Sequence, residues 1–292
     1  MKLNRITTSL GLAVLLCLSA SAFGQVNYSF ETIDYPKDGF TQLLGINNSG
    51  IIAGYHGATV NKGFTYNLMT KMFTNENFPG SAQTQVIGIN NQGKTSGFYI
   101  TTASKTLGFT KKAVFVAVAF PGTTFNQLLS QNDWAQAAGY YSTKADGTGP
   151  DHAYVYDESG SVFEEFIIPN STSAQATGIN NSGDVCGFTI DKATIMHGWL
   201  KVLGQITILD YPGASATQAL GLNNKGQVVG SYTDASGNSH GFVYLVGSKK
   251  WQSIDDPNGI DTTLVNGIND NGMLVGFSGT SPINNGFVAT PQ

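Results

Sequence analysis

The sequence has few of the residue types that bind anions. Charged residues make up 12% of the chain, about half of the ~25% usual in globular proteins. Arg5 is the only arginine, and without Lys2 and Arg5 the 15 basic residues fall to 13, against 19 acidic ones, a net charge of about −6. Such a surface has no guanidinium group and suits neither nucleic acid nor anionic lipid, so we expect neither partner.

Cysteine and long apolar stretches are also scarce. Cys17 lies in the apolar run LGLAVLLCL, and Cys186 is the only other cysteine, so the chain after this run cannot form an internal disulfide. Cys186 replaces Ala53 or Val229 of equivalent segments, and we expect a small buried residue. Beyond residue 24 no stretch is apolar for the ~18 residues of a membrane-spanning helix. We therefore expect no membrane span.

The first 24 residues have the pattern of a secretory signal peptide. Lys2 and Arg5 precede the apolar run, and the small residues SASAFG follow it, so cleavage after Ala22 or after Gly24 fits equally well. Leu16 stands before Cys17 where a lipoprotein signal has a small residue, which disfavours lipid anchoring. The sequence predicts a secreted or periplasmic protein with a single domain over residues 25–292.

Common catalytic and metal-binding motifs are missing as well. The chain contains no GxSxG, HExxH, CxxC or phosphate-loop sequence. DDPNGID at residues 255–261 and KADGTGPD at residues 144–151 mix carboxylates with glycine, but neither has the ligand spacing of a calcium loop, and turns favour the same residues. We expect no catalytic residue, metal or cofactor.

What the sequence does contain is a repeat. GINNSGIIAGY recurs as GINNQGKTSGF, SQNDWAQAAGY, GINNSGDVCGF, GLNNKGQVVGS and GINDNGMLVGF, and the six copies begin at Gly45, Gly88, Ser130, Gly178, Gly221 and Gly267. Their starts are 42 to 48 residues apart. A regular period of ~40 to 45 residues with strand signals and no helical periodicity is typical of four-stranded propeller blades.

Each period contains four strand-like segments. Around Gly221 they read ITILDYPG, ATQALGLNN, KGQVVGSY and HGFVYL; Pro and Gly end the first segment, and Asn-Asn-x-Gly favours a hairpin after the second. The chain after the leader begins with a first-type segment at Phe30 and ends with a fourth-type segment at residues 286–289. With first-type segments outermost, the N-terminal strand must complete the blade that begins near Leu264. We predict an all-β, six-bladed β-propeller closed by the N-terminal strand pairing with the last blade.

The combination of GINNxGxVVG with a following HGF resembles a bacterial extracellular repeat family named after its His-Ala-Phe triplet, the HAF-repeat family. The triplet matches at HAY, HGW and HGF, which begin at His152, His197 and His240, whereas Lys62, Leu107 and Asn285 replace histidine in the other copies. The resemblance covers about residues 30–290. It implies a secreted, strand-rich repeat protein and no activity that can be assigned to particular residues.

Residues present in every copy are expected to build the blade. Asn47 and its equivalents are interpreted as turn amides that bond local backbone, with a ring of amides around a polar ligand as the alternative. A glutamine lies three residues before the repeat glycine in five copies and Leu264 in the sixth. These glutamines are expected either to line a mouth of the central channel or to bridge blades: Gln42, Gln85, Gln127, Gln175 and Gln218.

The variable loops between the third and fourth segments should share one face of the ring with the Pro-Gly turns. The candidate binding residues on this face are those able to stack on or hydrogen-bond a sugar or peptide: Asp34, Tyr99, Tyr141, Asp210 and Tyr232. The triplet histidines are expected to make structural hydrogen bonds. Trp134 belongs to the opposite face, either as an exposed contact residue or packed beneath the ring.

Two functional hypotheses follow. The favoured one is a monomeric, non-catalytic binding or scaffolding module for carbohydrate or for another exported protein. The alternative is a propeller hydrolase or lyase acting on polysaccharide or a small lactone through Asp34, Asp210 or His56. That alternative requires two carboxylates, or a carboxylate and a histidine, to meet in the central cleft.

Overall fold

The structure is a computed structural model that describes residues 25–259, 262–279 and 283–292. The predicted signal peptide and the last two residues of the DDPNGID stretch lie outside the described residues. Every regular element in the described part of the chain is a β-strand, as predicted. No helix among these residues is long and apolar enough to cross a bilayer.

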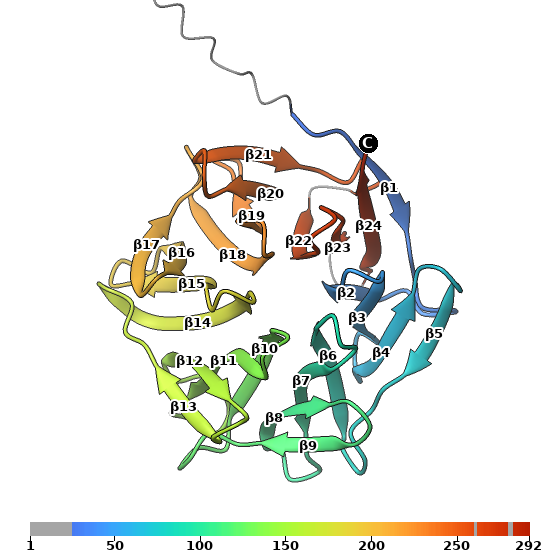
Figure 1. Ribbon diagram of the computed structural model, residues 1–292, viewed down its shortest axis with the longest axis vertical. Helices are drawn as coiled ribbons and strands as arrows, with labels where there is room; N and C mark the ends of the chain where they lie inside the picture. The colour runs from blue at the N-terminus through green and yellow to red at the C-terminus, as the bar shows by residue number, and fades with distance from the viewer. Residues whose placement is uncertain (1–24, 260–261, 280–282) are drawn as a thin grey trace, which may run out of the picture.

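Six four-stranded antiparallel sheets surround a central axis as propeller blades (Figure 1). Blade 1 contains β2 (Thr41–Ile46), β3 (Ile51–His56), β4 (Lys62–Asn67) and β5 (Met72–Asn75). Blade 2 contains β6 (Gln83–Ile89), β7 (Thr95–Ile100), β8 (Thr106–Lys111) and β9 (Phe115–Val118). Blade 3 contains β10 (Asn126–Gln131), β11 (Gln136–Ser142), β12 (Asp151–Asp157) and β13 (Val162–Glu165).

The remaining blades repeat this order from the axis outward. Blade 4 contains β14 (Ser171–Ile179), β15 (Val185–Asp191), β16 (Met196–Val202) and β17 (Gln205–Leu209). Blade 5 contains β18 (Ala216–Leu222), β19 (Gln227–Thr233), β20 (Ser239–Leu245) and β21 (Lys250–Ile254). Blade 6 contains β22 (Thr263–Ile268), β23 (Leu274–Ser278), β24 (Asn285–Pro291) and β1 (Tyr28–Thr32).

The ring closes through β1. This strand pairs antiparallel with β24, with Tyr28 opposite Pro291 and Thr32 opposite Phe287, and Figure 1 shows it on the outer side of β24. Blade 6 therefore takes its outer strand from the start of the described chain and its other three strands from the end. The predicted number of blades and the predicted closure are both confirmed.

The repeat glycine allows the six inner strands to crowd around the axis. A Cβ atom on Gly45 would lie 2.6 Å from the carbonyl oxygen of Ile87 in the next blade and 3.3 Å from the Gly88 Cα. At the seam, a Cβ atom on Gly267 would lie 2.7 Å from the carbonyl oxygen of Leu44. Because these neighbours are backbone atoms that cannot rotate away, a larger residue would force the inner strands apart.

The third glycine of the repeat, Gly230 in blade 5, explains why the VVG and HGF segments occur together. A Cβ atom on Gly230 would overlap the carbonyl oxygen of Gln218 and lie 2.8 Å from the ring of Phe242. The aromatic residue of the triplet thus covers this glycine, next to a β-bulge between Ala219 and Gly221 of the inner strand.

The apolar cores lie between blades rather than within them. One cluster joins Leu43, Ile52 and Phe64 of blade 1 to Val275 and Val288 of blade 6. The equivalent cluster between blades 4 and 5 contains Cys186, which is fully buried as expected, and burial raises the pKa of its thiol to about 12. Each blade therefore shields its apolar faces only with its neighbours in place.

Candidate functional site

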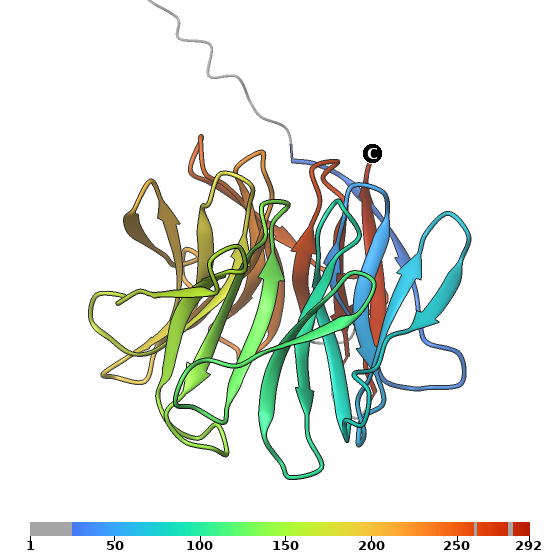
Figure 2. The same cartoon turned by 60° about the horizontal axis from the view of Figure 1, so that its bottom comes forward.

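The two faces of the ring differ in the connections that they carry (Figure 2). We call one the turn face, because it carries the six turns between the first and second strands of the blades. The loop face carries the loops between the second and third strands. Parallel bridges, Phe40 with Asn284 and Thr106 with Phe125, join the ends of these loops to the chain entering the next inner strand. The loops and the Pro-Gly turns therefore share a face, as predicted.

An axial cavity of about 170 Å³ lies at the turn face, where the inner strands end. Its apolar wall is formed by the residue before the repeat glycine in four blades: Leu44, Ile87, Leu129 and Leu220. Thr177 and Asn266 take this place in blades 4 and 6. The turns that follow add a polar rim, so the cavity is apolar in its wall and polar at its mouth.

The first asparagine of each turn joins a continuous ring of hydrogen bonds. Each side-chain Nδ2 donates to the backbone carbonyl of the equivalent asparagine in the next blade, and Asn269 closes the ring on Asn47 at 3.1 Å. Within its own turn, Asn47 Oδ1 accepts the backbone N–H groups of Ser49 and Ile51. The predicted local role is confirmed, whereas the bonds between blades were not predicted.

The second residue of each turn forms another closed ring, which we call the crown. Its members are Asn48, Asn91, Asp133, Asn181, Asn224 and Asp270. The backbone N–H of each member donates to the side-chain Oδ1 of the member in the next blade, at 2.8 to 2.9 Å. Every copy of the repeat has Asn or Asp at this position, which is the signal in the sequence that identifies the crown.

Two carboxylates occupy opposite places in the crown. Asp270 Oδ2 accepts the side-chain amides of Asn48 and Asn224 at 2.8 and 2.9 Å, and Asp133 Oδ2 accepts those of Asn91 and Asn181. Burial alone would raise the pKa of Asp270, but the amide donors outweigh it and the pKa is lowered. Asp270 is therefore ionised at neutral pH. In the described part of the chain, neither carboxylate forms an ion pair.

Trp134 lies next to the crown in the turn of blade 3. Its side chain is 67% exposed, so it does not pack beneath the ring, and its role as a contact residue stays a prediction. The following residue, Ala135, has φ +61°, where the other five blades have glycine at +72° to +78°. Blade 3 thus accepts an unfavourable backbone conformation in a turn that presents an indole to solvent.

The tyrosines predicted to bind a ligand on the loop face are stacked on neighbouring aromatic rings. Tyr99 is buried and stacks on Phe78 at 3.7 Å. Tyr141 lies between Phe120 and His152, with ring centroids at 4.0 and 4.8 Å. Tyr232 is enclosed in the same way by Tyr211 and His240 at 3.6 and 5.0 Å. Rings from the segments that enter each blade, together with the triplet histidine beside Tyr141 and Tyr232, therefore occupy the positions where a sugar was expected to stack.

The residues of the hydrolase alternative also take separate partners. Asp34 Oδ1 accepts the backbone N–H of Gly286, and its pKa is raised by burial, partly offset by that bond. Asp210 bonds His197 at 2.9 Å, and His56 bonds Asp38 at 2.8 Å. Among the described residues, Asp34, Asp210 and His56 therefore make no hydrogen bond or ion pair with one another, and none of them lines the axial cavity.

The triplet histidines make the structural hydrogen bonds expected of them. His152 bonds Glu165 at 3.2 Å. His240 lies between Asp255 and Asp234, at 2.8 and 3.3 Å, and His197 lies between Asp210 and Asp191 in the same way. Burial opposes the charged form of His197 and His240, but the hydrogen bonds and charges of the carboxylates outweigh it, so both pKa values are raised.

One of the two predicted roles of the five glutamines, bridging neighbouring blades, is observed for two of them. Gln85 and Gln175 bridge blades, donating to Asn61 Oδ1 and Asp151 Oδ2 of the preceding blade. Gln42 accepts from the Tyr55 hydroxyl and Gln218 from Ser231, both within their own blades. For Gln127, the backbone carbonyl accepts the Tyr154 hydroxyl. None of the five lines the axial cavity at the turn face.

The two stretches with a calcium-like composition hold no metal cluster in their described residues. Asp146 Oδ1 accepts the backbone N–H and the hydroxyl of Thr148, as in an ordinary turn. Over residues 25–259, 262–279 and 283–292, no three His, Cys, Asp or Glu side chains are placed to hold a metal ion.

Comparisons with known proteins identify the architecture. No protein-family model matches the sequence, and a comparison with curated proteins finds no match. Among solved structures, putative TolB from Agrobacterium tumefaciens is 8% identical with a TM-score of 0.65, covering 92% of this chain and 99% of that one. TolB from Acinetobacter baumannii is 11% identical with a TM-score of 0.58, covering 87% of this chain but only 63% of that one, so the chain spans less than two thirds of its length.

A lectin has a similar structure. Aleuria aurantia lectin, solved in complex with Fucalpha1-6GlcNAc, is 10% identical with a TM-score of 0.53, covering 85% of this chain and 92% of that one. At such low identities the likeness concerns the fold alone. By its strand order, its closure and these neighbours, the described chain is a six-bladed β-propeller.

Proposed function

We propose that the protein is a secreted or periplasmic, non-catalytic binding module of the HAF-repeat type, and that its crown and axial cavity bind the hydroxylated end of a carbohydrate. The observation that carries the proposal is the crown itself, a fixed ring of amide and carboxylate groups around the mouth of a cavity. The carbohydrate complex of a lectin with the same fold is compatible with it.

The chemistry of the crown suits hydroxyl groups. Each side-chain amide carries two N–H groups, and in Asn48 and Asn91 one of these is used on a neighbouring carboxylate. The second N–H and the remaining oxygen lone pairs provide alternating donors and acceptors around the mouth. The leucine and isoleucine wall beneath them suits the C–H face of a sugar ring, and the exposed Trp134 adds an aromatic surface beside Asp133.

The protonation of the crown argues for binding without hydrolysis. A glycosidase needs one carboxyl group whose pKa is raised enough to donate a proton. Asp270 has a lowered pKa, and Asp133 accepts three N–H groups through its two oxygens. Asp270 is thus held as an acceptor, a role that suits ligand binding better than proton transfer.

A glycan array followed by calorimetry with the chain from Gln25 tests the proposal. We expect Trp134→Ala to weaken binding of a glycan hit by about tenfold or more, because a tryptophan that anchors a binding site commonly contributes ~2 kcal/mol or more. Met69→Ala, which removes another strongly exposed apolar side chain, is the matched control and should leave the affinity unchanged.

The outcomes separate three possibilities. Loss of binding in Trp134→Ala supports the turn face. If Tyr141→Phe or Asp210→Asn weakens binding instead, the ligand lies on the loop face, as the sequence-based hypothesis has it. An array with no hit for the folded chain counts against carbohydrate binding altogether.

A further inference from the structure

A second concavity lies between blades 2 and 3, away from the axial cavity. Its volume is about 350 Å³, near the lower end of the ~300 to 1,000 Å³ typical of small-molecule sites. One side is formed by β9 and the residues before it, and the other by the end of β12 and the hairpin leading to β13. We call it the interblade groove.

The side formed by β9 is apolar and faces solvent. Val114, Val116 and Val118 alternate along the chain and line the groove together. Val114 is 70% exposed and Val116 is 53% exposed, although β9 is an outermost strand. The outer strand of blade 3 begins with Val162, which is 57% exposed, but continues to the charged pair Glu164 and Glu165. Blade 2 thus leaves uncovered an apolar wall that a ligand would remove from water.

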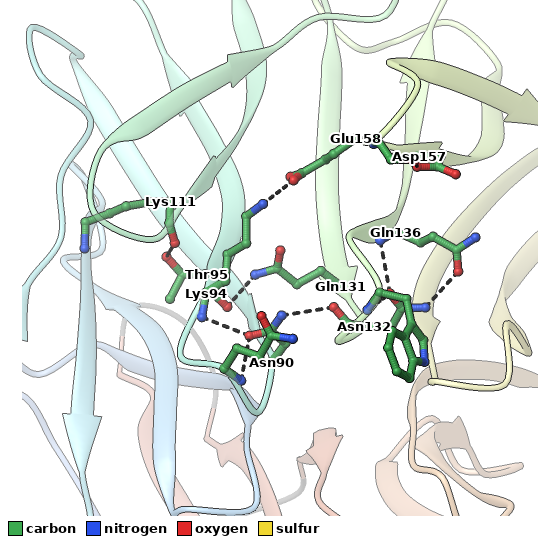
Figure 3. Close-up of polar contacts among 12 residues, drawn as sticks. Asn90, Lys94, Thr95, Lys111, Gln131, Asn132, Gln136, Asp157 and Glu158 are labelled. Carbon is green, nitrogen blue, oxygen red and sulfur yellow. Dashed lines mark hydrogen bonds and ion pairs between the residues drawn. The ribbon is translucent and has the colours of Figure 1, made fainter.

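The floor of the groove is an ion pair between Lys94 and Glu158, both largely buried (Figure 3). The Lys94 backbone is fixed to the inner rings, because its N–H donates to Asn90 Oδ1 at 2.9 Å and its carbonyl accepts the Gln131 side-chain amide. Figure 3 shows these contacts leading from the groove to the asparagine ring. The floor is therefore preorganised rather than free to collapse into the groove.

The groove carries an excess of positive charge on an acidic protein. Lys112 lines it and is exposed, and among the described residues it forms no ion pair. Lys94 and Lys112 together outnumber Glu158, whereas the whole chain carries a net charge of −4. A ligand with a single negative charge would thus meet a lysine that forms no ion pair with any described residue.

We propose that the interblade groove binds a small amphipathic carboxylate. Its carboxylate group pairs with Lys112, and its apolar body lies against Val114 and Val116. Tyr156 and Ser161 close the opposite side. This site is independent of the crown and of the carbohydrate proposed there, because the two concavities share no lining residue.

Octanoate, used below its micelle-forming concentration, is a suitable probe for the chain from Gln25. We expect saturable changes in the NMR methyl signals of Val114 and Val116, and octanamide, the uncharged analogue, should bind about two- to fivefold more weakly. Lys112→Ala should weaken octanoate binding by a similar factor, because the ion pair of an exposed lysine contributes modestly in water. Lys105→Ala, an exposed lysine elsewhere in blade 2, is the matched control.

Three results would overturn the proposal. These are equal binding of octanoate and octanamide, equal effects of Lys112→Ala and Lys105→Ala, and signal changes confined to residues outside the groove. Val116→Thr keeps the shape of the strand while making the wall more polar. It should reduce affinity for octanoate and leave glycan binding at the crown unchanged, which separates this site from the proposed function.

Discussion

Backbone conformation at single residues has a measurable cost in this ring, and Ala135 is the place to measure it. A non-glycine residue with positive φ costs roughly 1 to 2 kcal/mol, partly offset by the smaller entropy loss on folding. We expect Ala135→Gly to raise the free energy of unfolding by up to about 1 kcal/mol, as measured by urea denaturation. The reciprocal change, Gly93→Ala, is the control, because a Cβ atom there has no neighbour within 4 Å and φ is +74°. Gly93→Ala should destabilise by a similar amount; equal stability of both variants and wild type would contradict this account.

Asp270 gives the crown an acid-sensitive stability. Because its pKa is lowered in the folded state, it stabilises the fold at pH values above its ordinary value near 3.8, and this contribution is lost as the pH falls through the folded value. We expect Asp270→Asn to lower the free energy of unfolding at pH 7 by about 1 to 2 kcal/mol. The new amide N–H groups would face the donor amides of Asn48 and Asn224, which now bond the carboxylate.

Urea unfolding at pH 7 and at pH 3 measures the effect. The difference between wild type and Asp270→Asn should shrink at the lower pH. A constant difference would mean that the carboxylate charge is not the cause. Glu164→Gln serves as the control, because this carboxylate is 69% exposed and its ion pair with Lys201 lies at the surface, where such pairs contribute little.

His197 and His240 make the stability of the fold depend on pH in the opposite direction. Their pKa values are raised by the flanking carboxylates, so their contribution is present below the ordinary value of 6.5 and is lost as the pH rises through the folded values. We expect the melting temperature to fall as the pH is raised from 6 to 9, and the double variant His197→Gln, His240→Gln to show a flatter profile. If the melting temperature of the double variant falls with pH as steeply as that of the wild type, these histidines are not the cause.

At the scale of strands, closure depends on β1. Its five residues pair with β24 and cover an edge that would otherwise be open. A chain that begins at Tyr35 should therefore expose β24, unfold at much lower urea concentration than a chain that begins at Gln25, and associate through the open edge. Light scattering and urea denaturation of the two chains measure this. A monomeric shortened chain of equal stability would show that the seam does not need β1.

The sequence predicts the strands well because each depends on local chemistry. The period of the repeat gave the blades, and the order of segment types gave the closure by β1. The placement of side chains across the ring could not be predicted in the same way. Tyr141 and Tyr232 look like exposed loop residues, but Phe120 and Tyr211, from the segments between blades, stack on them. The crown likewise depends on contacts between turns 42 to 48 residues apart, of which the local sequence shows only the Asn or Asp and not its partner.

At the scale of the whole molecule, the ring is joined twice at its seam. Near the axis, Asn269 and Asp270 bond Asn47 and Asn48 across 222 residues of sequence. At the periphery, β1 pairs with β24. The apolar clusters lie between blades, so every blade relies on both of its neighbours. The hydrogen bonds between turns near the axis, which we call the hub, and the β1–β24 pairing at the periphery together keep each blade between two others.

The orientation of the peripheral seam has a mechanical consequence. The first residue of β1, Tyr28, lies opposite Pro291 at the end of β24, so a force that pulls the two ends of the chain apart acts on one pair of residues at a time. The hydrogen bonds between strands loaded in this way break one after another, instead of all resisting the force together. Tension would therefore separate β1 from β24 first, while the bonds at the hub still hold the blades in a circle.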